Sequence, residues 1–217
     1  MQEFSYAHRN TSSKDRWNTP QLTPELAAAR ESAFSREIPV AADDTLCFVL
    51  AQAAAIKPRR ILELGTAVGI TSAALALACP HAHITTVERE QKFYDEAVQN
   101  FNSLGISPRV CAILGDAGEV ISTLSGQFDM IFLDCAKVQY VKYLPRLKEL
   151  LSFGGVLLAD DVLLYGWASG EAEVPKKRKM LAQHIEEYLS AVTADGELVT
   201  AVVKVGDGMA VSVKKQL

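Results

Sequence analysis

Residues 61–69 read ILELGTAVG, and this stretch decides the fold of the chain. Its first four residues have the apolar character of a buried strand, and its two glycines let the backbone turn sharply into a helix that begins near Gly69. A strand that runs through a glycine loop into a helix is the first half of a βαβ unit. Because glycines also let a ligand approach the backbone closely, the stretch predicts a binding loop at the carboxyl end of this strand.

Strands and helices alternate along the chain from this loop onward. The expected strands are residues 60–64, 84–87, 110–114, 130–133 and 156–159, and helices are expected to begin near Gly69, Arg89, Ala117 and Tyr140. Two more helices precede the first strand. One begins at Thr23-Pro24-Glu25, which supplies a cap, a proline and an acidic first turn, and the other is expected to be capped by Asp43 or Asp44. This alternation predicts an α/β fold with a parallel sheet covered on both faces.

The last part of the chain does not continue this alternation of strands and helices. After a helix expected around residues 177–192, two β-rich runs at 197–205 and 209–213 flank a Gly-Asp-Gly turn at 206–208. Such a turn predicts a hairpin, so one antiparallel strand should join the otherwise parallel sheet. No repeat, low-complexity tract or linker divides the chain, which predicts a single domain over residues 21–217 and a mobile polar segment over residues 1–20.

Composition narrows the class of protein. The chain has 217 residues, of which 49% are hydrophobic, and a formal net charge of −4, which argues against a broad basic surface. No apolar run approaches the roughly 20 residues that span a bilayer, and the polar start lacks the apolar core of a signal peptide. The four cysteines are scattered without a CxxC pair, so they predict neither a zinc site nor a disulfide framework. We expect a cytoplasmic protein.

Acidic side chains follow two of the expected strands at the point where each strand ends. Asp134 comes directly after residues 130–133, and Asp160 and Asp161 follow residues 156–159. Because the carboxyl ends of parallel strands meet at one edge of a sheet, these carboxylates should lie close together, where hard oxygen ligands favour Mg²⁺, Mn²⁺ or Ca²⁺ over zinc. Lys137 is near enough in sequence for its amine to reach the same place, and a metal with an amine can deprotonate a hydroxyl. The alternative is that these aspartates merely cap the following helices.

Carboxylates also follow the first three strands, and they indicate the kind of cofactor. The glycine loop lacks the G-x-G-x-x-G spacing of a dinucleotide site. Glu63 would repel a pyrophosphate but attract the positively charged S-adenosylmethionine. Glu88 ends the second strand, where a carboxylate can meet two ribose hydroxyls, and Asp116 with Ala117 can contact an adenine ring. An ordinary tight turn between strand and helix remains the alternative for the loop.

Taken in order, these motifs resemble the class I S-adenosylmethionine-dependent methyltransferases. More narrowly, the chain is similar to the metal-dependent O-methyltransferase family that includes catechol and caffeoyl-CoA O-methyltransferases and the bacterial tRNA 5-hydroxyuridine methyltransferases. The resemblance runs from residue 38 to the C-terminus and depends mainly on residues 61–69, 134–140 and 154–163. It implies a Rossmann-like, seven-stranded, mostly parallel sheet whose C-terminal hairpin supplies the antiparallel strand, usually in a homodimer.

The resemblance also implies a role for particular residues. It makes Asp134, Asp160 and Asp161 the metal ligands, and it places Lys137 where catechol O-methyltransferases carry their general base, with Asp134 beside it at the catalytic centre. The cofactor contacts that it implies are Val40, Glu63, Gly65, Thr71, Glu88, Asp116, Ala117 and Asp134. The family commonly has Asn where this chain has Asp161, a departure that adds negative charge and bears on metal affinity and preference.

Two substrates fit this chemistry, a small catechol-like phenol and 5-hydroxyuridine in tRNA. Tyr165 and Trp167 can form a lid against a flat ring, or they can simply pack the loop down. A basic run at residues 176–179, at an expected helix N-terminus, suits an anionic partner unless it is only a solvated face. The short segment between Asp161 and the last helix resembles the compact bacterial members, which favours tRNA.

Two other classes of function stay open at this stage. A nicotinamide-dependent reductase shares the alternating strands and helices, but it needs a third glycine in the loop and a catalytic Tyr-x-x-x-Lys. A non-catalytic nucleotide-binding module needs neither Lys137 nor three metal ligands.

Overall fold

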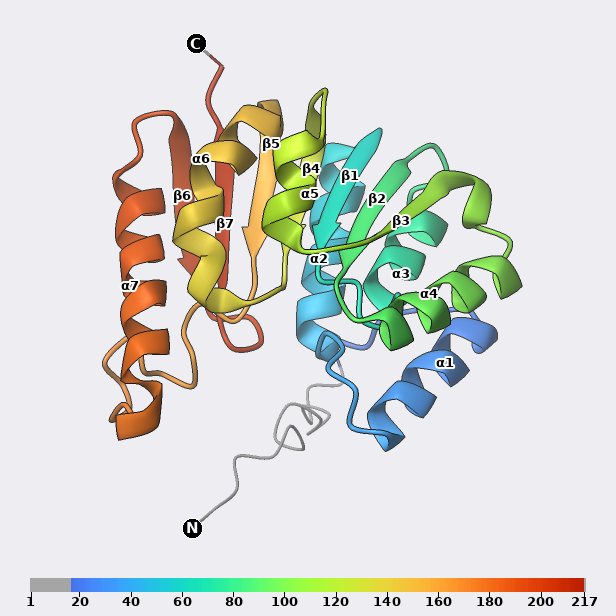
Figure 1. The fold of residues 1–217 in the computed structure, drawn as a ribbon, viewed down its shortest axis with the longest axis horizontal. Helices are drawn as coiled ribbons and strands as arrows, with labels where there is room; N and C mark the ends of the chain where they lie inside the picture. Colours follow the sequence, from blue (N-terminus) through green and yellow to red (C-terminus); the bar gives the residue numbers. More distant parts are fainter. Residues whose placement is uncertain (1–16, 217) are drawn as a thin grey trace.

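The computed structural model describes residues 17–216, and its centre is a single mixed sheet (Figure 1). The strand order is β3-β2-β1-β4-β5-β7-β6. The strands are β1 (Arg60–Leu64), β2 (His83–Glu88), β3 (Val110–Leu114), β4 (Phe128–Leu133), β5 (Leu151–Ala159), β6 (Leu198–Val203) and β7 (Met209–Lys214). Strands β1 to β5 pair in parallel, whereas β7 is antiparallel to both of its neighbours, β5 and β6. The predicted fold class and the C-terminal hairpin are therefore confirmed.

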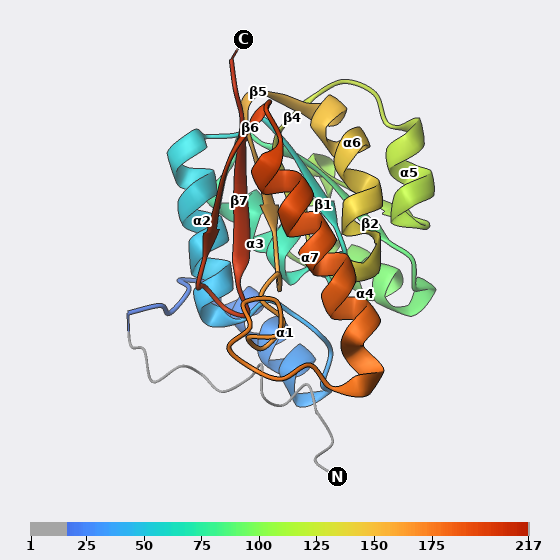
Figure 2. The same cartoon turned by 90° about the vertical axis from the view of Figure 1, so that its left-hand side faces the viewer.

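Helices cover both faces of the sheet (Figure 2). They are α1 (Pro24–Ser35), α2 (Asp43–Ile56), α3 (Ile70–Ala78), α4 (Gln91–Ser103), α5 (Ala117–Thr123), α6 (Tyr140–Leu150) and α7 (Lys179–Ala194), with short 3₁₀ turns η2 (Ser107–Arg109), η3 (Lys137–Gln139) and η4 (Lys176–Arg178). Helices α1 to α4 pack on one face, and α5 to α7 pack on the other. Within the described residues no helix is long and apolar enough to span a membrane.

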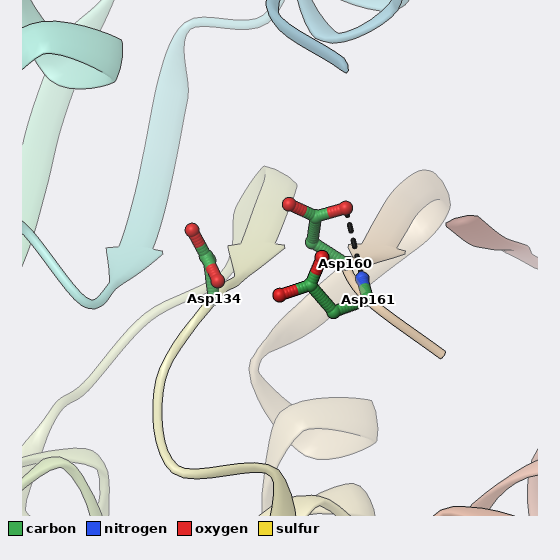
Figure 3. A group of neighbouring side chains, drawn as sticks. All are labelled: Asp134, Asp160 and Asp161. Carbon is green, nitrogen blue, oxygen red and sulfur yellow. Dashed lines mark hydrogen bonds between the residues drawn. The ribbon is translucent and has the colours of Figure 1, made fainter. Parts of the chain in front are cut away.

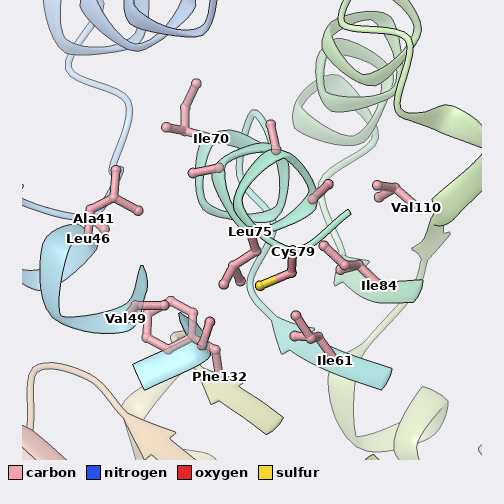
Figure 4. Packing of buried hydrophobic residues seen from close by; sticks show 14 of the residues in the cluster. Ala41, Leu46, Val49, Ile61, Ile70, Leu75, Cys79, Ile84, Val110 and Phe132 are labelled. Carbon is pink, nitrogen blue, oxygen red and sulfur yellow. The ribbon is translucent and has the colours of Figure 1, made fainter. Parts of the chain in front are cut away.

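Two hydrophobic cores lie on either side of the sheet because successive strand residues point to opposite faces. In β1, Ile61 belongs to the core under α2 and α3, whereas Leu62 belongs to the core under α6. Figure 4 shows Ile61, Ile84 and Phe132 beneath α3. Burying an aliphatic or aromatic side chain stabilises a fold by roughly 1.5–3 kcal/mol, so these two layers hold the strand ends in place.

The two helices before the first strand test the predicted caps. At α1 the prediction is confirmed, because Thr23 Oγ1 accepts a hydrogen bond from Leu26 N at 3.3 Å and Pro24 is the first helical residue. At α2 the prediction is wrong, because the cap residue is Ala42 and both aspartates lie inside the first turn. Tertiary partners hold these two carboxylates instead: Asp43 accepts from Arg30 Nη1 at 2.5 Å, and Asp44 accepts from Gly206 N at 2.9 Å.

The turn between β6 and β7 is hydrogen-bonded to the segment that follows β5, the strand next to β7. Gly208 O accepts a hydrogen bond from Val162 N, and Asp207 O accepts one from Leu163 N, both at 2.9 Å. The carboxylate of Asp207 accepts a third, from Tyr165 N at 2.5 Å. The C-terminal hairpin therefore braces the loop that begins with Asp160 and Asp161. Residues 1–16 of the N-terminal segment predicted to be mobile lie outside the described residues.

Candidate functional site

A cleft of about 890 Å³ opens at the carboxyl ends of the parallel strands. Its wall includes Gly65 after β1, Glu88 at the end of β2 and Asp116 after β3. The segments that follow β4 and β5 contribute Asp134 and Asp160. Strand order explains this meeting, because β4 lies between β1 and β5 and all five strands point the same way. It is the edge of an open α/β sheet at which ligands bind.

Three carboxylates cluster in this cleft, as Figure 3 shows. Asp134, Asp160 and Asp161 each offer one oxygen, and the three oxygens lie within 4.8 Å of one another. Asp160 and Asp161 are both only 5% exposed. None of the three caps a helix: Asp160 Oδ1 accepts from the neighbouring Asp161 N at 2.9 Å, and the next turn, η3, has Ala136 at its cap. The capping alternative is therefore wrong for these residues.

The backbone at Asp161 is in the left-handed region, with φ of 57°. Among residues other than glycine, Asn and Asp visit this region most readily, because their short polar side chains can bond locally. The turn therefore explains why a position that bears a carboxylate in this chain also suits Asn. This backbone conformation accompanies the placement of an Asp161 carboxylate oxygen near those of Asp134 and Asp160.

Lys137 lies against this cluster from the turn that follows β4. Its Nζ is 2.6 Å from Asp134 Oδ1 and 3.2 Å from Asp161 Oδ2, and its side chain is 12% exposed. Burial alone would lower the pKa of this ammonium, but the charges of Asp134, Asp161 and Asp160 raise the pKa well above its usual value. Lys137 is therefore a cation held by two of the three carboxylates.

The charge balance of the cluster suits a divalent cation. Burial and the neighbouring charges of Asp161 and Asp134 raise the pKa of the Asp160 carboxyl well above its usual value, despite the opposing effect of Lys137. One ammonium is thus not enough to hold the pKa of the buried Asp160 carboxyl in its usual range beside two further carboxylates. Three hard oxygen donors without His or Cys match the ligand preference of Mg²⁺ and Mn²⁺.

The other half of the cleft, at the ends of β2 and β3, holds two carboxylates fixed by backbone groups. Glu88 Oε2 accepts from Ala67 N at 2.8 Å, and its Oε1 accepts from Arg89 N at 2.9 Å. Asp116 caps α5, accepting from Gly118 N at 2.8 Å through Oδ1. A carboxylate has about four acceptor sites, so each keeps capacity for a ligand hydroxyl or amine.

Of the eight residues predicted to contact a cofactor, six line the cleft: Val40, Gly65, Glu88, Asp116, Ala117 and Asp134. The other two, Glu63 and Thr71, lie behind the glycine loop. Glu63 is 1% exposed, and its Oε2 accepts from Thr86 Oγ1 at 2.6 Å and from the Ser72 hydroxyl on α3. Glu63 therefore links β1, β2 and α3 behind the glycine loop and does not line the cleft.

The burial of Glu63 predicts a pH-dependent stability. Burial raises the pKa of its carboxyl from the usual 4.5 to about 7, although Ser72 and Thr86 oppose the shift. The folded protein thus binds this proton more tightly than the unfolded chain, so the free energy of unfolding should fall by about 3 kcal/mol as pH rises from 4.5 to 7. Urea unfolding at pH 5 and pH 8 measures this change, and Glu63→Gln should remove that part of it. An identical pH dependence in the variant would contradict the assignment.

Several residues in the cleft wall had no signal in the sequence. Phe93 on α4, Gln139 on η3 and Tyr143 on α6 all line it. Burial raises the pKa of the Tyr143 phenol to about 12, so this group stays neutral. An amphipathic helix shows which of its residues are buried, but it does not show which ones reach a cleft at its end.

The two aromatic residues after the aspartate pair have different environments. Trp167 is 7% exposed and belongs to the core under α7, whereas Tyr165 is 43% exposed. Their ring centroids are 5.3 Å apart, and both line the cleft. Trp167 therefore packs the loop down, and Tyr165 presents the ring that a flat ligand can contact.

The basic run at residues 176–179 begins α7, as the sequence predicts. Its first three residues form η4, and Lys179 is the first residue of the helix. Among these four residues only Arg178 lines the cleft. The other three basic residues are exposed and do not line the cleft.

Comparisons with known proteins show the family to which the chain belongs. A family model described as O-methyltransferase matches residues 11–215. Catechol O-methyltransferase of Mycobacterium tuberculosis is 33% identical over 157 residues, which span 69% of this chain and 70% of that protein. Caffeoyl-CoA O-methyltransferase of Stellaria longipes is 30% identical over 196 residues, which span 85% and 80%. A crystal structure of a Staphylococcus aureus protein, provisionally named caffeoyl-CoA O-methyltransferase, matches with a TM-score of 0.81 and 29% identity, covering 88% of this chain and 93% of that one.

Proposed function

The chain belongs to the O-methyltransferase family and is an S-adenosylmethionine-dependent enzyme, and from that premise we propose that it methylates one of two adjacent hydroxyls on a small aromatic ring with the help of a divalent cation. The observation that carries the proposal is the cluster of Asp134, Asp160 and Asp161 with Lys137 in contact. It shares one cleft with the loop and carboxylates expected to hold the cofactor.

Within this proposal the two halves of the cleft have separate tasks. Gly65, Glu88 and Asp116 bind S-adenosylmethionine, whose ribose hydroxyls suit Glu88 and whose adenine suits Asp116 and Ala117. Asp134, Asp160 and Asp161 hold the cation. Mg²⁺ at these carboxylates would lower the pKa of a bound hydroxyl and offset the negative charge that keeps Lys137 protonated.

Lys137 then acts as the proton acceptor. Its Nζ already lies at the carboxylates, and once a bound cation has offset their charge, the neutral amine can take the proton of a substrate hydroxyl. The resulting oxyanion attacks the methyl carbon, the bond from that carbon to sulfur breaks, and S-adenosylhomocysteine leaves with the bonding electrons. Since the sulfonium is already a good leaving group, the protein contributes mainly by positioning, which can lower a barrier by about 7–11 kcal/mol.

Charge in the cleft favours a small phenol over a polyanion. Nine carboxylate residues line it, against the three basic residues Arg89, Lys137 and Arg178. Such a wall disfavours phosphate groups inside the cleft itself and tolerates an uncharged or cationic ring there. The names of the relatives, catechol and caffeoyl-CoA O-methyltransferase, support an aromatic substrate with adjacent oxygens. The exposed ring of Tyr165 supplies a flat surface for it.

A labelling experiment tests the function. The protein is incubated with methyl-labelled S-adenosylmethionine and Mg²⁺ and with catechol, phenol or total tRNA. We expect label in catechol and none in phenol, because phenol lacks the second oxygen. EDTA should abolish turnover, and excess Mg²⁺ should restore it. Unchanged activity in EDTA would contradict the role of the metal.

Two controls separate the competing hypotheses. Calorimetry should detect binding of S-adenosylmethionine but not of NADH, and the opposite result would favour a reductase. If label enters tRNA and not catechol, changing Lys176, Lys177 and Lys179 to alanine should weaken tRNA binding and flatten its salt dependence. With catechol as the substrate, the same triple variant should keep normal activity, because none of the three residues lines the cleft. The homodimer, the cytoplasmic location and the single domain over residues 21–217 stay predictions.

A further inference from the structure

Tyr140, the first residue of α6, ends the turn that carries Lys137 away from the end of β4. Its side chain is fully buried. Its hydroxyl donates to Leu133 O at 2.8 Å and lies 3.3 Å from Asp160 O. The first acceptor precedes Asp134 in the chain, and the second belongs to a proposed metal ligand. One phenol therefore contacts the backbone at the ends of both strands that bear the carboxylate cluster.

These contacts lie where the two strands separate into loops. The last ladder pair between β4 and β5 is Leu133 with Ala159. Just beyond it, Leu133 O also accepts a hydrogen bond from Asp160 N at 3.0 Å. The hydroxyl of Tyr140 donates to the same carbonyl, so it adds a side-chain hydrogen bond at the place where the ladder between β4 and β5 ends. A small separation of these strand ends would move Asp134 and Asp160 apart directly.

The ring of Tyr140 also lies close to the ammonium group of Lys137. The ammonium nitrogen of Lys137 lies 5.6 Å from the centroid of the Tyr140 ring, within the range of a cation–π contact. Anchoring Tyr140 to Leu133 folds residues 134–140 back on their own strand. This fold holds Lys137 against Asp134 and Asp161.

We propose that Tyr140 is a positioning residue that sets the spacing of the carboxylates from β4 and β5 and thereby the affinity of the site for a divalent cation. The inference depends on the proposed function, because it concerns the same metal site. It extends that function to a residue that touches neither the metal ligands' carboxylate oxygens nor the cleft. Groups that orient metal ligands typically change metal affinity by 10- to 100-fold when they are removed.

The structure offers a matched control for the alternative that Tyr140 only fills space. Its ring packs edge to face on Tyr188 of α7, with centroids 5.4 Å apart and an interplanar angle of 75°. Tyr188 is equally buried, yet within residues 17–216 its hydroxyl has no hydrogen-bond partner. Changing either tyrosine to phenylalanine removes one buried oxygen from the same aromatic pair. Only Tyr140→Phe removes a bond to the site.

The test measures Mn²⁺ affinity of the wild type, Tyr140→Phe and Tyr188→Phe by electron paramagnetic resonance, and S-adenosylmethionine affinity by calorimetry. We expect Tyr140→Phe to bind Mn²⁺ 10- to 100-fold more weakly and S-adenosylmethionine within twofold of the wild type. Tyr188→Phe should match the wild type in both. The rise in unfolding temperature at saturating Mn²⁺ gives a second measurement if Tyr140→Phe is less stable, and this rise should be smaller than in Tyr188→Phe.

The outcomes distinguish the two hypotheses. Equal Mn²⁺ affinities in the two variants, with binding in the wild type, would overturn the positioning role and leave the proposed function intact. A wild-type protein that binds no Mn²⁺ would overturn the metal-dependent function and the positioning role together. A parallel loss of Mn²⁺ and S-adenosylmethionine affinity in Tyr140→Phe would show general damage to the fold, and it too would overturn a specific role.

Discussion

Replacing Asp160 with alanine is expected to lower kcat/KM for catechol by about a thousandfold or more, a loss of ~4 kcal/mol in transition-state stabilisation. Asp160 is buried and supplies one of only three clustered carboxylate oxygens, so its loss leaves two ligands for the cation. The affinity for S-adenosylmethionine should change little, because Asp160 is not among the residues expected to hold it, most of which lie near the carboxyl ends of β1, β2 and β3. Initial rates across a Mg²⁺ titration and calorimetry with the cofactor measure the two effects.

A matched control for this variant lies at the opposite end of the sheet. Asp129 in β4 also fixes backbone groups, because its Oδ2 accepts from Arg59 N at 2.8 Å and from Arg60 N at 3.0 Å. Asp129→Asn should keep full activity, although it can lower stability. If Asp160→Ala retains activity within tenfold of the wild type, the carboxylate cluster does not hold a catalytic metal.

Replacing Gly65 with alanine is expected to destabilise the protein by more than about 3 kcal/mol and to abolish cofactor binding. A Cβ at this position would lie 2.0 Å from the carbonyl oxygen of Asp134, a distance that requires the backbone to move. The residue also has φ of +105°, which is strained for a side chain. Since Gly65 directly follows β1 and Asp134 directly follows β4, any shift separates the two halves of the cleft. Urea unfolding and calorimetry with S-adenosylmethionine measure the outcome.

A control at Gly105 distinguishes the effect of the close approach to Asp134 from the strain of a positive φ. Its φ is +68°, but a Cβ there would meet nothing within 4 Å. Gly105→Ala should therefore cost only about 1–2 kcal/mol, the strain of a left-handed alanine, and leave cofactor binding unchanged. Equal destabilisation of the two variants would mean that the approach of Gly65 to Asp134 contributes nothing.

The sequence predicted the position of the carboxylates because their location depends only on strand ends. Asp134 and Asp160 each follow an apolar run, and a parallel sheet brings the ends of such runs to one edge. Two details needed three-dimensional information. Asp43 lies inside α2 because Arg30 from another helix binds it, and tertiary contacts override local capping preference. Glu63 lies beneath the loop because alternation along β1 directs it, like Ile61, toward α3.

Hydrogen bonds between a side chain and a distant backbone group could not be predicted from the sequence. Tyr140 is the start of an amphipathic helix, and its buried ring is what such a pattern predicts. Nothing in the pattern indicates that its hydroxyl reaches Leu133 O, because that contact depends on how tightly the turn after Asp134 folds back. The Asp207 carboxylate that accepts from Tyr165 N is a similar case, since the two residues come from segments far apart in the chain.

The insertion of β7 between β5 and β6 has a consequence for synthesis on the ribosome. Strand β6 leaves the ribosome before β7, yet its only neighbour in the sheet is β7. Until residues 209–214 emerge, the growing chain exposes the unpaired edge of β5, a surface that favours association with other strands. The turn that braces the loop after Asp161 arrives with the same strand. The nascent enzyme should therefore stay inactive until β7 has left the ribosomal tunnel and paired with β5.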